Sequence, residues 1–204
     1  MVAKFLKDYH NPASIYVNER NRWVWLRIHK NAGTSMYDGF LKDYCHNMIK
    51  KPKGVHDPTV DKWLTELTDE KLEGYTVWAC VRNPYDRFCS MARMFRIEPN
   101  RFAREFWEFR ENKPIIRRHS EPQNRFTHNR SIPIVTKTIR FETLQTDFDQ
   151  LCTELKLPQH KLSTMNASPR EGHWMEALSE ESIKFVNGVF YFDFEYFGYN
   201  MIKI

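Results

Sequence analysis

A segment of small and polar residues near the start of the chain has the composition of an anion-binding loop. Its members are His29, Lys30, Asn31, Ala32, Gly33, Thr34 and Ser35. Backbone N–H groups at the N-terminus of a helix carry partial positive charge, and small residues let an anion approach them closely. Lys30 adds a full charge, and Thr34 and Ser35 add hydroxyl donors. The segment therefore predicts a phosphate or sulfate site, with a plain strand-to-helix turn as the alternative.

The order of residues in this segment differs from that of the Walker A loop. The Walker A pattern is Gly-x-x-x-x-Gly-Lys-Ser/Thr, in which the lysine directly follows a glycine. Here Lys30 precedes Gly33 instead. The order argues against an ordinary ATPase or GTPase, although a P-loop nucleotide kinase or hydrolase stays open as an alternative function.

A second segment, residues 81–90, carries an arginine and a serine that could contact one anion. Arg82 follows a short apolar run, so it lies at the carboxyl end of a predicted strand, where ligands collect in open α/β sheets. Its planar guanidinium matches a phosphate, and Ser90 in the following helix supplies a neutral donor to the same group. The alternative is that Arg82 pairs with Asp86 in a helix-capping arrangement.

Hydrophobic spacing predicts the elements that position both segments. Strands are expected over residues 14–17, 23–28, 75–81 and 132–141, the first two forming a hairpin or an adjacent pair. Helices are expected over residues 34–45, 58–72, 84–95 and 144–155, with another marked by Phe102, Phe106 and Phe109. Alternating strands and helices imply an α/β fold of three layers, α/β/α, with a central parallel sheet. The 204 residues show no linker or repeat, so we expect a single domain over residues 1–204.

The overall charge favours an anionic ligand but does not identify it. Lys and Arg number 31 against 26 Asp and Glu, which suits a nucleotide, an acidic glycan, nucleic acid or a membrane surface. No helix-turn-helix, zinc or RNP-type signature supports the alternative of a nucleic-acid-binding module. Six arginines could form a basic approach for an anionic acceptor: Arg93, Arg96, Arg101, Arg104, Arg117 and Arg118. Pro99 interrupts any single helical face, so a solvated surface is the favoured interpretation.

Hydropathy and cysteine usage bear on the compartment. No stretch approaches the ~18 consecutive apolar residues of a spanning helix, and the N-terminal residues lack a hydrophobic signal core. The cysteines Cys45, Cys80, Cys89 and Cys152 contain no Cys-x-x-Cys pair, and their apolar surroundings are typical of buried, reduced thiols. We therefore expect a cytoplasmic protein that contacts no membrane.

In this order, the two segments resemble the donor-binding motifs of sulfotransferases that use 3′-phosphoadenosine 5′-phosphosulfate (PAPS). They resemble in particular the carbohydrate branch, which includes heparan sulfate 2-O-sulfotransferase and the chondroitin sulfotransferases. The resemblance extends through residues 118–123, 139–144, 147–148 and 191–199, and so covers most of the chain between residues 23 and 199. The chain departs from the Golgi members, since it shows neither their N-terminal membrane anchor nor their disulfides.

The resemblance implies a P-loop-like fold and roles for individual residues. Lys30 and residues 31–35 would hold the 5′-phosphosulfate, and Lys30 would also stabilise the departing phosphate. Arg82 and Ser90 would hold the 3′-phosphate. Arg170 lies in a segment that resembles the loop closing over the nucleotide, and it could touch the donor. The implied co-substrate is PAPS, its product is 3′-phosphoadenosine 5′-phosphate (PAP), and no metal is expected.

The general base is chosen among the histidines. A hydroxyl nucleophile loses its proton as it attacks sulfur, and the ordinary pKa of histidine, near 6.5, suits that task. His56, between the two donor segments, is the first candidate, His119 is the second, and His29 is less favoured because it precedes Lys30 in the loop. The acceptor is expected to offer a hydroxyl group, on a carbohydrate or a small molecule, and a catalytically inactive PAPS-binding fold remains the alternative.

Overall fold

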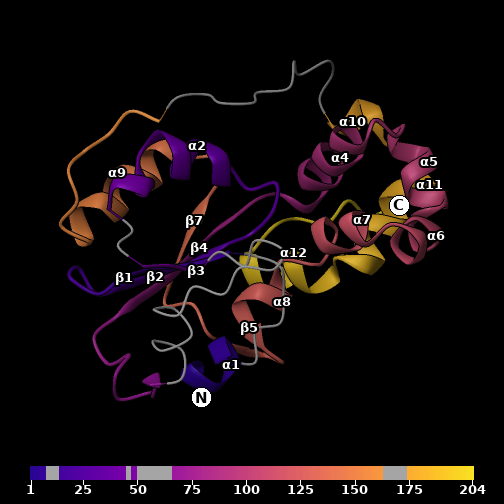
Figure 1. Ribbon diagram of the computed structural model, residues 1–204. Helices are drawn as coiled ribbons and strands as arrows, with labels where there is room; N and C mark the ends of the chain where they lie inside the picture. Colours follow the sequence, from indigo (N-terminus) through magenta and orange to yellow (C-terminus); the bar gives the residue numbers. More distant parts are fainter. Residues whose placement is uncertain (8–13, 45–46, 50–65, 163–173) are drawn as a thin grey trace.

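The computed structural model describes residues 1–7, 14–44, 47–49, 66–162 and 174–204 (Figure 1). Within these ranges the strands are β1 (Ser14–Asn18), β2 (Trp23–Arg27), β3 (Asn47–Ile49), β4 (Thr76–Val81), β5 (His128–Asn129), β6 (Ile132–Pro133) and β7 (Lys137–Arg140). The helices are α1 (Val2–Lys7), α2 (Gly33–Gly39), α4 (Pro84–Phe95), α5 (Pro99–Arg104), α6 (Phe106–Asn112), α7 (Pro114–His119), α8 (Asn124–Thr127), α9 (Leu144–Glu154), α10 (Trp174–Ala177), α11 (Glu180–Val189) and α12 (Tyr191–Phe197). A single 3-10 turn spans Leu41–Asp43.

The main sheet is mixed, with the strand order β3-β1-β2-β4-β7. Strands β2, β4 and β7 are parallel, whereas β1 runs antiparallel to both β2 and β3. The prediction of a central parallel sheet is therefore wrong for β1, which lies between β3 and β2. The hairpin predicted there is confirmed, and it is the reason for the difference. Only a short turn separates β1 from β2, and parallel neighbours need a crossover of a dozen or more residues.

Alternation of side chains along the strands buries both faces of this sheet. On one face, Trp25 and Trp78 stack with ring centroids 5.3 Å apart, in a core shared with α2 and α9. On the other face, Val24 and Ala79 pack in a core that includes α1 and Phe126 of α8. Figure 1 shows α2 and α9 on one side of the sheet and α1 and α8 on the other. Helices on both faces explain why residues 75–81 are nearly all apolar.

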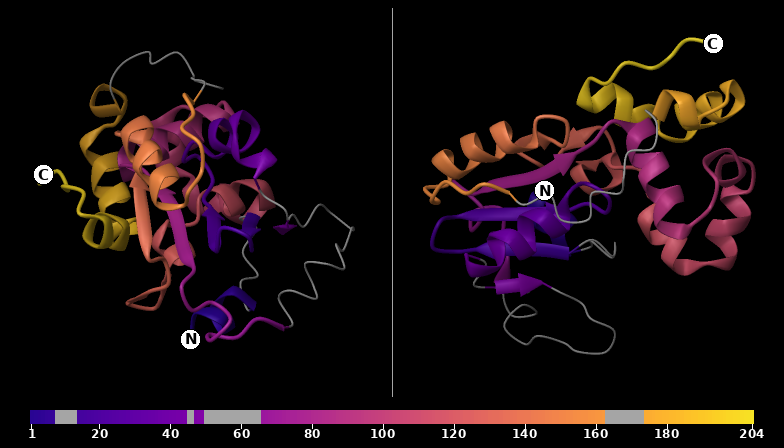
Figure 2. Two further views of the ribbon diagram at one scale, coloured as in Figure 1. Left: turned by 90° about the vertical axis from the view of Figure 1, so that its left-hand side faces the viewer. Right: turned by 90° about the horizontal axis from the view of Figure 1, so that it is seen from above.

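A lobe of helices lies beyond the carboxyl end of β4, where the chain passes directly into α4. It is formed by α4, α5, α6, α7, α10, α11 and α12, and its core contains Phe88, Phe102, Phe106, Phe190 and Phe194. The right-hand view of Figure 2 shows this helical lobe beside the end of the sheet. The lobe therefore adjoins the edge at which both chemistry-bearing segments begin.

The observed helices agree with the predicted ones where local signals are strong. Helix α4 has the predicted bounds, and its cap is formed by Asn83, whose side chain accepts from the backbone N–H of Tyr85 at 3.0 Å. The helix predicted over residues 34–45 ends earlier, at Gly39, because glycine is a poor helix former. The helix marked by three phenylalanines is two helices, α5 and α6, that share one core.

Two further predictions differ from the structure. The strand predicted over residues 132–141 is divided into β6 and β7, because Pro133 lacks an N–H and the backbone N–H of Ile134 bonds instead to Thr127 at 2.7 Å. Most of the helix predicted over residues 58–72 lies outside the described residues. Its described end forms hydrogen-bonded turns, in which the N–H of Leu72 bonds to the carbonyl oxygens of Thr68 and Asp69.

The cysteines and the helix lengths were also predicted from the sequence. Cys80, Cys89 and Cys152 are buried and free of disulfides, as predicted, and burial raises the pKa of each thiol. Cys45 lies outside the described residues. In the part of the chain that the structure describes, no helix has the length and apolar character needed to cross a membrane.

Candidate active site

The predicted anion-binding loop connects β2 to α2 through two residues in the left-handed region of backbone conformation. Lys30 has φ 69° and Ala32 has φ 55°, and Ala32 caps α2 without a side-chain hydrogen bond. Left-handed residues reverse the chain within a short distance. The loop is therefore a tight turn whose small residues bring the backbone of α2 close to the end of β2.

Gly33, the first residue of α2, allows the side chain of Arg27 to cross the loop. A Cβ atom at this position would lie 2.5 Å from the Nε atom of Arg27 and 3.0 Å from its Cγ atom. The guanidinium of Arg27 continues to Thr34, donating to its hydroxyl oxygen at 3.3 Å. Glycine is needed here because any side chain would displace Arg27, which holds the first turn of α2.

The Asn31 side chain is buried beneath the loop, with 1% of its surface exposed. Its amide nitrogen donates to the carbonyl oxygen of Cys80 and to Oε1 of Gln123, both at 2.7 Å. One bond reaches strand β4, and the other reaches the segment before α8. The Asn31 side chain thus fixes the loop to the sheet, and only the backbone of this residue can face a ligand.

Gln123 connects the two chemistry-bearing segments. Its Oε1 atom also accepts from the backbone N–H of Arg82 at 2.9 Å, and its Nε2 atom donates to the carbonyl oxygen of Arg82 at 2.8 Å. The backbone N–H groups of Gln123 and Asn124 donate to the buried carboxylate of Asp193 in α12, at 2.8 and 2.7 Å. The loop and the end of β4 are therefore joined through the side chain of Gln123, and α12 is joined to them through its backbone.

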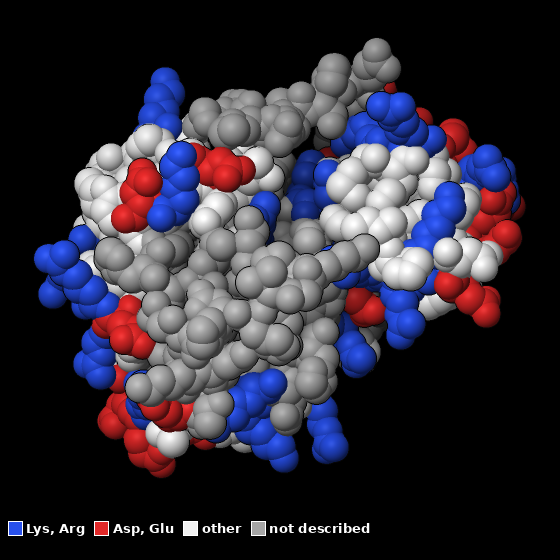
Figure 3. Space-filling view, in the orientation of Figure 1, with Lys and Arg blue, Asp and Glu red and all other residues white. Residues whose placement is uncertain are grey.

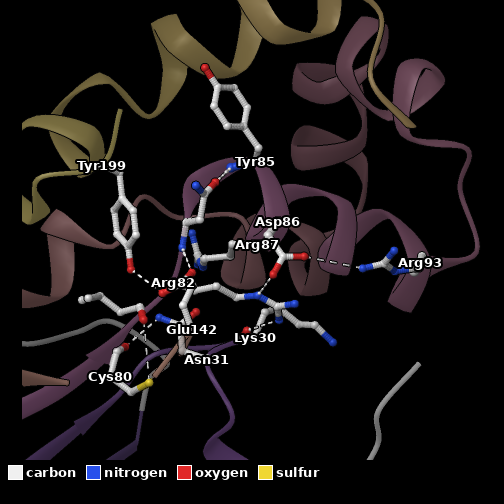
Figure 4. A network of polar contacts seen from close by, with 12 residues as sticks. Lys30, Asn31, Cys80, Arg82, Tyr85, Asp86, Arg87, Arg93, Glu142 and Tyr199 are labelled. Atoms are coloured by element: carbon white, nitrogen blue, oxygen red, sulfur yellow. Dashed lines mark hydrogen bonds and ion pairs between the residues drawn. The ribbon is translucent and has the colours of Figure 1, made fainter. Parts of the chain in front are cut away.

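Arg82 lies at the end of β4, and its side chain is directed toward the loop (Figure 4). Its Nη1 atom donates to the carbonyl oxygen of Lys30 at 3.0 Å, and its Nε atom pairs with Asp86 at 2.8 Å. The guanidinium lies over the ring of Phe141, 3.8 Å from the centroid. The pairing with Asp86, one of the two interpretations of the sequence, is thus present. The contact with Lys30 brings the two segments together.

The Arg87 side chain bonds to backbone carbonyl oxygens of the loop and of the segment after α7. It is buried, and it donates to the carbonyl oxygens of His29, His119 and Glu121 at 3.2, 3.0 and 2.9 Å. Burial lowers the pKa of Arg87 to about 10, so the side chain keeps its charge at neutral pH. This arginine positions the predicted anion-binding loop against the segment after α7.

Several cations converge at this site. Lys30 is half-buried, and its pKa is lowered first by burial and then by the charges of Arg82, Arg93 and Arg87. Asp86 pairs with Arg82 and, at 3.9 Å, with Arg93. Figure 3 shows basic side chains inside the hollow between the helical lobe and the part of the molecule that carries α2 and α9. Positive charges that repel one another in a partly buried place favour binding of an anion.

Ser90 lies on the same face of α4 as these charges. It is half-buried, and it follows Asp86 by four residues and precedes Arg93 by three. Residues with this spacing are neighbours on a helix surface. The hydroxyl of Ser90 therefore belongs to the row of side chains that Arg82 begins.

A comparison with known families identifies the class of this protein. The model of the sulfotransferase family matches residues 13–200, almost the whole chain. The chain belongs to the sulfotransferase family. Sulfuryl transfer is accordingly the reaction that the match supports, and the convergent cations suit the anionic groups that this reaction handles. Comparisons with curated proteins and with solved structures gave no match.

In this sulfotransferase, one of the histidines predicted as a general base lies beside the predicted anion-binding loop. The ring of His119 lies against the ring of His29, with centroids 4.0 Å apart, and Phe95 contacts it edge-on. The Nδ1 atom of His119 is 2.8 Å from the carbonyl oxygen of Ile115. An N–H at Nδ1 satisfies that carbonyl, which leaves the lone pair of Nε2 available as a base.

The remaining predicted site residues are distributed as follows. Thr34 and Ser35 lie in the first turn of α2, where Thr34 is half-buried and Ser35 is buried. His56 and Arg170 lie outside the described residues. Sequence reasoning gave no site role to Gln123, Arg87 or Asp193. All three lie in segments that carry the resemblance, but their partners are remote in the sequence and no local pattern shows those contacts.

Gln123→Leu tests the connection between the segments. The substitution keeps an apolar stem but leaves both backbone groups of Arg82 without a partner and removes one of the two acceptors of the Asn31 amide. We expect the free energy of unfolding to fall by at least about 2 kcal/mol, because unsatisfied buried polar groups cost ~1–3 kcal/mol each. Gln150→Leu, at an exposed position of α9, should change it by less than about 0.5 kcal/mol. Equal effects in urea denaturation would contradict this role.

Lys30→Gln tests the electrostatic coupling between the predicted anion-binding loop and His119. Burial lowers the pKa of His119, and the charges of Lys30, Arg118 and Arg87 lower it further. Removing the charge of Lys30 removes repulsion of the imidazolium, so the pKa of His119 should rise toward 6.5 in an NMR titration. His128 is the control, since burial alone lowers its pKa. An unchanged His119 titration, or an equal rise at His128, would show that the coupling is absent.

Proposed function

We propose that this sulfotransferase takes the sulfuryl group from PAPS and transfers it to a hydroxyl of a carbohydrate or small-molecule acceptor. The observation that carries the proposal is the contact between the two donor segments, in which Arg82 donates to the carbonyl oxygen of Lys30 at 3.0 Å. PAPS has anionic groups at both its 5′ and 3′ positions. A site that joins two cationic segments suits such a donor better than a nucleotide with a single phosphate group.

The proposed donor roles are those that the resemblance to PAPS-dependent sulfotransferases implies. Lys30 and the loop of Asn31, Ala32, Gly33, Thr34 and Ser35 would bind the 5′-phosphosulfate, with β2 and α2 acting as a P-loop-like unit. Arg82 and Ser90 would bind the 3′-phosphate from the end of β4 and the face of α4. Arg170, outside the described residues, is proposed to reach the donor as well. These roles are supported by the charges that surround Lys30.

The reaction is proposed to be an in-line displacement at sulfur. The acceptor oxygen forms a bond to sulfur while the bond between sulfur and the bridging oxygen of the 5′-phosphate breaks. That oxygen keeps the electron pair, PAP leaves, and the hydroxyl proton passes to a histidine. Lys30 would stabilise the charge that grows on the departing phosphate, so that catalysis comes from positioning and electrostatics. No metal takes part in this scheme.

We propose that the general base is one of two histidines. His56 is the first choice from its place between the donor segments, and it lies outside the described residues. His119 is the second choice, and its position beside His29 and the free Nε2 lone pair support it. A lowered pKa keeps the imidazole of His119 neutral, as a base requires.

Binding of PAP tests the proposed donor. In calorimetry without metal, the protein should bind PAP at micromolar concentration and prefer it to AMP and ATP. Arg82→Ala should weaken PAP binding by about 10–100-fold, the effect of one charge-assisted hydrogen bond, and weaken adenosine 5′-phosphosulfate far less. Arg125→Ala, at an exposed position, serves as the control. No preference of the wild type for PAP over AMP would overturn the proposed donor, and equal losses for both ligands in Arg82→Ala would overturn the 3′-phosphate role.

Single-turnover assays identify the base. With labelled PAPS and an acceptor found by screening hydroxyl compounds, His56→Ala should abolish transfer while PAP affinity stays near that of the wild type. If transfer survives in His56→Ala and is lost in His119→Ala, the base is His119. A wild type that binds PAP and transfers sulfate to none of the acceptors would favour an inactive PAPS-binding fold.

A further inference from the structure

Arg93 occupies a position on α4 that differs from that of the neighbouring arginines. Sequence patterns group it with Arg96, Arg101 and Arg104 as part of a solvated surface. The other three are exposed, as expected, but the side chain of Arg93 is only 30% exposed. It points back along the helix toward Asp86 (Figure 4). The spacing of Asp86, Ser90 and Arg93 puts Ser90 on the same face of the helix. The expectation of a solvated side chain is therefore wrong for Arg93.

The contacts of Arg93 leave part of its guanidinium unsatisfied. Its Nη2 atom is 3.9 Å from Oδ1 of Asp86, beyond hydrogen-bonding distance, while Oδ2 of that carboxylate is held by Arg82 at 2.8 Å. Its Nε atom is buried and has no hydrogen-bond partner among the described residues. One carboxylate is thus shared by two guanidinium groups, and the nearer one takes the stronger bond.

We infer that Arg93 is a third ligand of the 3′-phosphate of the donor, beside Arg82 and Ser90. The inference rests on the proposed function and deepens it. A phosphate monoester offers three acceptor oxygens and up to two negative charges. A single guanidinium group and a single hydroxyl neutralise only one of these charges, so the phosphate can take a further cationic ligand. Arg93 lies one turn beyond Ser90 on the same face of α4, so an anion at the Ser90 hydroxyl is within reach of its N–H groups.

Asp86 fits this arrangement as a spacer between the two arginines. It contacts both guanidinium groups, and its single charge leaves a net positive charge on the three side chains. The charge of Arg93 also acts on Lys30, which means that it lies within electrostatic range of the 5′ part of the site. The two arginines and Ser90 would therefore select a nucleotide with a 3′-phosphate over one without it.

The test compares PAP with AMP in calorimetric titrations of Arg93→Gln. Loss of one charge-assisted contact should weaken PAP binding by about 10-fold or more and change AMP binding by less than about twofold. Arg93→Lys keeps the charge but loses the planar fork, so its PAP affinity should fall between those of the wild type and Arg93→Gln. Arg104→Gln, an exposed arginine of the same lobe, should leave both affinities unchanged.

The outcomes separate this inference from the proposed donor. If the wild type prefers PAP and Arg93→Gln keeps the whole preference, the role of Arg93 is wrong while the donor stands. Equal losses of PAP and AMP would also overturn it, because they indicate an effect on the fold or the 5′ part of the site. If the wild type shows no preference for PAP, both are wrong. Thermal melting of each variant checks that the variant is folded. If Arg93→Gln is not folded, the comparison is made with Arg93→Lys instead.

Discussion

The geometry of the candidate site depends on the buried amide of Gln123. It bonds to the side chain of Asn31 in the predicted anion-binding loop and to both backbone groups of Arg82 at the end of β4. Its own backbone is held by Asp193 in the last helix. Buried polar groups are costly without partners, so these segments keep a single relative arrangement. Sheet, loop and helical lobe are locked together at the point where the cations meet.

The same arrangement imposes an electrostatic cost on the folded protein. Burial and like charges both lower the pKa of Lys30, and burial lowers the pKa of Arg87. Uncompensated repulsion of this kind opposes folding, and functional sites are where proteins tolerate it. The aromatic stack of Trp25 and Trp78 and the phenylalanine core of the helical lobe supply apolar burial on either side of the site. An anion would relieve this repulsion when it binds, so binding of an anion here would also stabilise the fold.

Local signals were enough to predict the elements that carry the site, but not their connections. The apolar run of β4, the Asn83 cap and Pro84 act within a few residues, and α4 has the predicted bounds. The bond from Asn31 to Gln123 spans 92 positions, and that from Gln123 to Asp193 spans 70. The spacing of hydrophobic residues cannot predict hydrogen bonds between positions so far apart in the sequence. The half-buried state of Arg93 likewise depends on Asp86 and on the packing of α4.

The helical spacing of residues in α4 determines which of its side chains reach the site. Asp86, Ser90 and Arg93 recur at spacings of four and three residues, so they lie along one face and continue the line that Arg82 begins at the end of β4. Arg87, the next residue after Asp86 in α4, bonds three carbonyl oxygens and so holds the helix against rotation about its axis. The row of polar side chains therefore cannot turn away from Lys30. The contacts of Arg87 therefore determine which side chains of α4 can meet an anion beside Lys30.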